Sequence, residues 1–242
     1  KSYRKYAGKY NLYFYGTVNC ESGTVTVATL EINFAKEEAV TMKIATSEGG
    51  EKLYYGELQI SEMSPNVFIV LNSDFGEQVS LTFYDEPMNC ETFQCAVGAM
   101  LSISAGDLKR APVLNRFIIT GYDVDEAHMK FIKAHLKLNT KYIDITPEMI
   151  STSVEGVFGK CEMADRITDR LKKAFYSKRY YAIEDSFIVN TLRKDENLSL
   201  RQADELIAEL RNHSLSNINF KINKSLDSTV YRCTNPKNIS QE

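Results

Sequence analysis

Basic and aromatic side chains gather in one stretch in the second half of the chain. Arginine and lysine bind phosphate oxygens, and an aromatic ring beside them can stack on a base. The stretch contains Lys172, Lys173, Lys178, Arg179, Tyr180 and Tyr181. We therefore expect these six residues to bind an anionic ligand such as a nucleotide. Asp165 and Asp169 lie just upstream, as on the solvated face of an ordinary helix, which is the alternative interpretation.

Other residue types that carry chemistry do not form a recognisable motif. His128 and His135 lie seven residues apart on a predicted helix, whereas zinc-binding helices usually space their histidines by four. Cys90 and Cys95 are interpreted as small buried side chains rather than as a redox pair. We find no Ser-His-acid order, nucleophile elbow or glycine-rich phosphate loop. The sequence thus predicts a protein that is not an enzyme and has no cofactor or metal.

The composition is that of an ordinary globular protein. Of 242 residues, 43% are hydrophobic and 25% are charged, which argues against disorder. The net charge of −3 argues for neither a nucleic-acid coat nor a polybasic membrane anchor. Five cysteines without CxxC spacing fit reduced thiols, so we expect a cytoplasmic protein. Every apolar run is far shorter than the roughly 20 residues of a membrane span, and no span is predicted.

Apolar and polar residues alternate through the first 120 residues, with the period of two that a half-buried strand requires. The predicted strands cover 8–18, 25–34, 40–44, 54–60, 67–71, 79–83, 95–103 and 113–120. In the second strand the alternation slips near Ala28, which predicts a β-bulge. The short turns leave no room for crossover helices, so neighbouring strands should pair antiparallel. We expect the first and last strands to close an eight-stranded barrel, with a two-sheet sandwich as the alternative.

The strand phases predict which side chains face the interior. The expected core comprises Leu12, Phe14, Leu81, Phe83, Val97, Leu101 and Ile118. Tyr13 and Tyr15 alternate with the core residues of the first strand and should face the other side, where they could dock a second domain.

A helix-rich segment follows the strands. Asp123 to Glu126 starts a predicted helix, and 142–145 is a short strand. We divide the chain into a β-domain over 1–145 and a helical domain over 146–242, which makes an α+β protein. Thr146-Pro147 and a Ser199–Gln202 capping box should begin helices, and 183–192 should continue a helical face. Segments 218–222 and 229–233 could form a hairpin, as in a winged-helix module.

The order of eight meandering strands, one helix and one short strand resembles the lipocalin or calycin family. Gly8-Lys9-Tyr10 resembles the Gly-x-Trp of that family, and Arg116 resembles the basic residue that packs over it. The resemblance covers the chain to about residue 146 and implies a barrel that binds a small molecule. Bacterial defence effectors also use a minimal eight-stranded barrel, in their case to sense a cyclic nucleotide.

Three functions are compatible with these features. We favour a non-enzymatic sensor in which the barrel or a crevice between domains binds a small molecule and signals to an output segment. The second hypothesis is a DNA-binding regulator that uses the C-terminal helices and hairpin. The third is a protein-interaction module without a ligand.

Overall fold

We describe the protein from a computed structural model. The described residues are 3–17, 24–46, 49–85, 93–104, 110–138, 142–175 and 181–215, with the backbone of 219–221. None of the helices in this part of the chain has the length and apolar character needed to span a bilayer.

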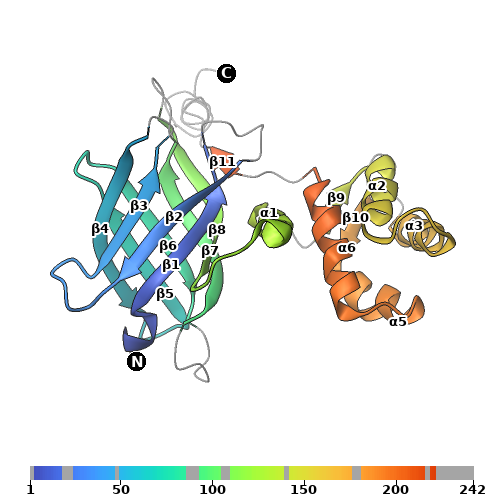
Figure 1. Cartoon of the computed structure of the whole chain (residues 1–242), viewed down its shortest axis with the longest axis horizontal. Helices are drawn as coiled ribbons and strands as arrows, with labels where there is room; N and C mark the ends of the chain where they lie inside the picture. The colour runs from blue at the N-terminus through green and yellow to red at the C-terminus, as the bar shows by residue number, and fades with distance from the viewer. Residues whose placement is uncertain are drawn as a thin grey trace, which may run out of the picture.

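Eight antiparallel strands form a closed barrel (Figure 1). The strands are β1 (Gly8–Tyr15), β2 (Val25–Ile32), β3 (Val40–Ala45), β4 (Glu51–Ile60), β5 (Asn66–Asn72), β6 (Gln78–Tyr84), β7 (Cys95–Ile103) and β8 (Pro112–Thr120). Each strand pairs with the next one in the chain, and β1 also pairs with β8, from Asn11 opposite Thr120 to Phe14 opposite Phe117. The prediction of a closed barrel is therefore confirmed.

The expected core is confirmed for four of its seven members. Leu12, Phe14, Leu81 and Phe83 are buried together inside the barrel. The prediction is wrong for Val97 and Leu101, which lie on the outer face of β7 and are about half exposed.

The sequence of β7 has apolar residues on both faces of the strand, so hydrophobicity does not mark the face that points into the barrel. Its inward residues are Ala96, Gly98 and Met100. A Cβ on Gly98 would lie 2.5 Å from the ring of Phe117, so bulky side chains must use the other phase. Ile118 is buried as expected, but on the outer wall instead of inside the barrel.

The predicted bulge in β2 is also wrong. The pairing of β1 with β2 keeps one register from Gly8 opposite Ile32 to Tyr15 opposite Val25. Val27 is simply an outward residue, 47% exposed, while Ala28 and Leu30 point inward.

One end of the barrel is plugged by aromatic side chains. The short helix η1 (Tyr3–Tyr6) places the Tyr6 ring 5.2 Å from the Phe93 ring, measured between centroids, and the Tyr6 hydroxyl donates to the Asp85 carboxylate. Tyr10 donates to the Tyr6 carbonyl at 2.9 Å. This plug packs against the buried core of the barrel.

A single helix joins the barrel wall to the rest of the chain. Asp125 caps the helical turn η2 (Glu126–His128), which leads into α1 (Met129–Leu136). Tyr13 and Tyr15 face outward as predicted, and they pack with Ile118 against α1. The Tyr15 hydroxyl donates to the Lys133 carbonyl at 2.9 Å. These tyrosines therefore dock α1, which in turn packs on α6.

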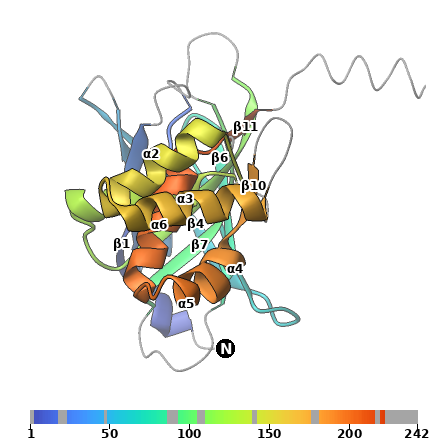
Figure 2. The same ribbon diagram turned by 90° about the vertical axis from the view of Figure 1, so that its right-hand side faces the viewer.

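The helical part has its own core, which includes residues of a two-stranded sheet. Its helices are α2 (Pro147–Phe158), α3 (Glu162–Ala174), α4 (Asp185–Phe187), η3 (Ile188–Leu192), α5 (Arg193–Asp195) and α6 (Leu200–Asn212). Figure 2 shows helices α2 to α6 in front of the barrel strands. The predicted caps of α2 and α6 are confirmed, including the Ser199–Gln202 capping box. The sheet pairs β9 (Tyr142–Ile145) with β10 (Tyr181–Glu184), so Ile183 belongs to a strand and not to a helix. With the barrel, these elements confirm the α+β class.

The first arm of the expected hairpin lies beside the barrel. β11 (Asn219–Lys221) pairs antiparallel with β8, with Phe220 opposite Leu114. The second arm, 229–233, lies outside the described residues, so the winged-helix module stays a prediction. The division into domains at residue 145 also stays a prediction.

Candidate functional site

The predicted basic cluster is only partly described. Lys178, Arg179 and Tyr180 lie outside the described residues. Lys172 on α3 donates to the Ser151 hydroxyl of α2 at 3.1 Å, and Lys173 is exposed. Tyr181 belongs to β10 and is buried in the core of the helical part, which leaves its ring without an open face. A nucleotide site formed by all six residues therefore stays a prediction.

The basic residues upstream of this cluster are neutralised by acids. Arg166 and Arg170 of α3 contact the Glu196 carboxylate at 3.3 and 3.2 Å, and Arg170 also pairs with Asp195. Hydrogen bonds and charge from these two acids raise the pKa of Arg170. This face of α3 is an ion-paired surface that holds α5.

The histidines do not come together as a metal site. The Nδ1 atoms of His128 and His135 lie 2.6 Å from the Asp125 carboxylate and 2.8 Å from the Phe131 carbonyl, both on their own helical segment. Within the described ranges, no group of three His, Cys, Asp or Glu side chains could hold a metal ion. A Ser–His contact does exist, with Ser153 Oγ 3.0 Å from His213 Nδ1, but Ser153 is fully buried and cannot reach a substrate.

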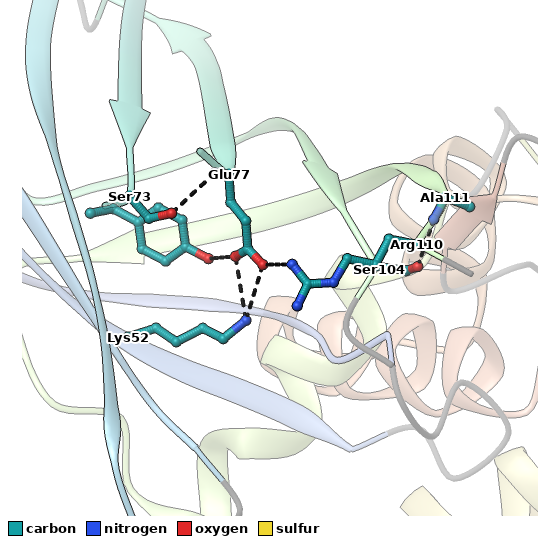
Figure 3. Close-up of polar contacts among 7 residues, drawn as sticks. Lys52, Ser73, Glu77, Ser104, Arg110 and Ala111 are labelled. Carbon is teal, nitrogen blue, oxygen red and sulfur yellow. Dashed lines mark hydrogen bonds and ion pairs between the residues drawn. The ribbon is translucent and has the colours of Figure 1, made fainter. Parts of the chain in front are cut away.

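A charged cluster occupies the barrel end opposite the aromatic plug (Figure 3). At its centre is the Glu77 carboxylate, whose side chain is only 13% exposed. Tyr54 Oη donates to Glu77 Oε2 at 2.7 Å, and Lys52 Nζ lies 3.3 Å from the same oxygen. Arg110 Nη1 pairs with Glu77 Oε1. We call Lys52, Tyr54, Glu77 and Arg110 the mouth cluster.

Strand ends and turns position the mouth cluster. Lys52 and Tyr54 lie two residues apart on β4 and so point to the same side of the strand, into the barrel. Glu77 ends a turn that closes with Ser73: the Glu77 N–H donates to Ser73 Oγ at 3.1 Å, and the Ser73 N–H donates to the Glu77 carbonyl at 2.8 Å. The carboxylate is thus fixed by backbone geometry.

Arg110 is positioned from the other side of the mouth. The next residue, Ala111, donates its N–H to Ser104 Oγ at 3.0 Å, and the Ser104 N–H donates to the Ala111 carbonyl at 2.9 Å. These bonds join the end of β7 to the start of β8 and anchor Arg110 beside Glu77.

The electrostatics of the mouth cluster favour an ionised Glu77 carboxylate. Burial alone would raise the pKa of Glu77, but the hydrogen bond from Tyr54 and the charges of Lys52 and Arg110 outweigh it and lower that pKa. Burial and the Glu77 carboxylate raise the pKa of Tyr54, which therefore stays a donor. Within the mouth cluster two cations face one carboxylate, and the side chains of Lys52 and Arg110 are 36% and 52% exposed, so both are partly open to solvent.

The sequence carries a signal for this site in the inward positions of two strands. Lys52 lies two residues before the inward Tyr54, and Glu77 lies two residues before the inward Val79. By the alternation of a strand, both charged side chains therefore also point inward. A charged residue at an inward position marks the open end of a barrel. Arg110 carries no such signal, because it precedes its strand.

Comparisons with known proteins give no relative for this chain. No family model, curated protein or solved structure matches it. The closed eight-stranded barrel is consistent with a lipocalin-like architecture. The particular contact expected from that resemblance is not formed, because Tyr10 points into the barrel while Arg116 donates to the His135 carbonyl on α1, outside the wall.

Proposed function

We propose that this protein is a non-enzymatic binding module that takes an anionic small molecule at the mouth cluster. The observation that supports this proposal is the arrangement of Lys52 and Arg110 around a single, largely buried carboxylate at the barrel end opposite the aromatic plug. Apolar residues would close the end of a barrel at lower cost, because burying charges incurs a desolvation penalty. Charges retained at such a cost are characteristic of binding sites.

The anion would bind at the rim and not inside the barrel. The interior below the mouth is filled by buried side chains such as Met42, Leu71 and Leu81. The ligand would accept hydrogen bonds from Lys52 and Arg110, which Glu77 holds in place. The lipocalin-like resemblance supports the same location, since ligands of β-barrels enter at the mouth.

An exposed ring next to the mouth favours an anion that carries an aromatic group. Phe75 is 89% exposed and lies in the turn between Ser73 and Glu77. An aromatic side chain beside cations suits a base and its phosphate. The proposed ligand class is therefore a nucleotide, with cyclic AMP and inorganic phosphate as the first probes.

Calorimetric titration with these two probes tests the proposal. Lys52→Gln and Arg110→Gln should each weaken binding about 10-fold or more, since a hydrogen bond to a charged group is worth about 1.5–3 kcal/mol. Lys43→Gln is the matched control, because Lys43 lies on neighbouring β3, is 53% exposed and points outward. Glu77→Gln keeps a side-chain oxygen that can accept from Lys52 and Arg110 but removes the negative charge that repels an anion, so it should tighten binding.

The anion affinities of these variants, compared with that of the wild-type protein, distinguish a ligand site from an ion-pair network that only stabilises the barrel. A stabilising network predicts that Glu77→Gln lowers the melting temperature without any gain in anion affinity. If the wild-type protein binds neither probe at millimolar concentration, the proposal fails. Phe75→Ala should weaken cyclic AMP alone and leave phosphate unchanged.

A further inference from the structure

The outer wall of the barrel exposes apolar side chains over β5 to β8. Six of them are between 38% and 51% exposed, although all belong to regular strands. They are Phe68, Val70, Val97, Leu101, Ile103 and Leu114. Single exposed apolar residues are normal on a protein surface, but a contiguous group marks an interaction site.

The strand registers show that these side chains are contiguous. Val70 is linked through Ser80 to Leu101, and Leu101 lies opposite Leu114. Residues directly opposite each other on neighbouring strands have Cβ atoms about 4.5–5.5 Å apart, so this row is continuous across four strands. Phe68 begins a second row beside it, through Thr82 to Ala99.

Charge separates this wall from the rest of the barrel. Strands β5, β6 and β7, which are described throughout, contain no Asp, Glu, Lys or Arg. Outer positions on the other strands carry charges, including Lys9, Glu31 and Lys43. Glu57, opposite Val70, and Arg116, opposite Ala99, border the neutral strands on their two sides. We call the outer side of β5 to β7 with Leu114 the neutral wall.

We propose that the neutral wall is the contact between two copies of this chain. A two-fold axis places the same surface opposite itself, so charges on it would repel their own copies, whereas a wall without charges meets itself without penalty. A strongly charged partner would find no counter-charge on it. Neutral apolar rows match another sheet of the same kind, because sheets pack face to face about 10 Å apart through such side chains.

The size of the wall predicts a weak dimer. Four strands spaced about 4.8 Å apart, and the rise of about 3.3 Å per residue from Val97 to Ile103, give a face of about 15 by 20 Å before the rim is added. Specific interfaces bury about 800 Å² per partner, and smaller ones are transient. We therefore expect a weak dimer that dissociates on dilution. This inference does not depend on ligand binding at the mouth.

Sedimentation equilibrium of the whole chain from about 1 to 300 µM tests the dimer. The average mass should rise with concentration toward twice that of the monomer. Val97→Glu and Leu101→Glu should raise the dissociation constant at least 10-fold. Val27→Glu is the matched control, because Val27 is also an outward valine, 47% exposed, but lies on β2.

Circular dichroism of each variant confirms that the barrel is folded before its mass is interpreted. A wild-type protein that stays monomeric up to 300 µM overturns the inference, whatever other proteins it binds. An equal loss of dimer in Val27→Glu also overturns it, because the effect would then come from added charge and not from the neutral wall.

Discussion

Gly56 lies where two strands approach so closely that no side chain fits. It pairs with Leu71 across the β4–β5 ladder, and its missing Cβ would point into the barrel. A Cβ built on Gly56 would lie 1.9 Å from the Val70 carbonyl oxygen and 3.0 Å from the Leu71 Cα. Carbon and oxygen in van der Waals contact are more than 3 Å apart, and the clashing atoms belong to backbone, which cannot rotate away.

Gly56→Ala should therefore force the β4–β5 ladder open. A backbone displacement of more than 1 Å would break one or two ladder hydrogen bonds and leave buried groups unsatisfied, at about 1–3 kcal/mol each. We expect the free energy of unfolding to fall by about 3–5 kcal/mol. The loss of glycine flexibility in the unfolded chain would offset only about 0.4–1 kcal/mol of this.

Urea unfolding followed by circular dichroism measures the effect. Gly156→Ala is the control, because Gly156 lies within α2 and a Cβ there would meet no atom within 4 Å. This change should raise stability by about 0.5–1 kcal/mol, the usual preference of a helix for alanine. If Gly56→Ala unfolds within 1 kcal/mol of the wild-type protein, the close approach of β4 and β5 is refuted.

Three further predictions concern the core, the pH dependence and a helix cap. Phe117→Ala should cost about 3–5 kcal/mol because the ring is fully buried, whereas Val97→Ala should cost less than about 1 kcal/mol because that side chain is half exposed; both are measured by urea unfolding. Burial lowers the pKa of Lys137 from 10.5 to about 8. The unfolded chain therefore holds this proton more tightly, and the free energy of unfolding should rise with pH above about 8, by at most about 1.4 kcal/mol per pH unit. Unfolding curves between pH 7.5 and 9.5, below the ionisation of tyrosine, should show this rise in the wild-type protein and lose it in Lys137→Met. Ser199→Ala removes the cap of α6 and should lower the melting temperature by an amount equivalent to about 1 kcal/mol, while no change would mean that the capping box contributes nothing.

The barrel could be predicted from sequence because most of its strands are apolar on one face only. The phase of β7 could not, because Cys95 to Leu101 is apolar on both faces and only the contact of Gly98 with Phe117 decides which side turns inward. The pairing of β9 with β10 could not be predicted from the sequence either, since Tyr142–Ile145 and Tyr181–Glu184 are short and separated by two helices. Local periodicity carries no information about such distant partners.

The candidate site could be predicted less well than the fold. The densest run of positive charge predicted a site at the end of α3 and just after it. On α3 itself, Arg166 and Arg170 are already paired with acids. The mouth cluster instead combines residues from β4, from the turn before β6 and from the segment before β8, each unremarkable in its own part of the sequence. The barrel brings these separate segments together, so a site of this kind can be predicted only when the order and register of the strands are known.

The pairing of β1 with β8 has a consequence for how the chain folds. Each of the other strand pairs in the barrel joins neighbours in the sequence, but this one joins Asn11 to Thr120 and closes a loop of more than one hundred residues. The entropy of such a long loop must be lost before the contact stabilises anything, which makes closure a slow step. During synthesis, β1 keeps an unpaired edge until β8 has been made, and unpaired edges are where chains aggregate. The folding rate of this protein should therefore be set by the meeting of its first and eighth strands.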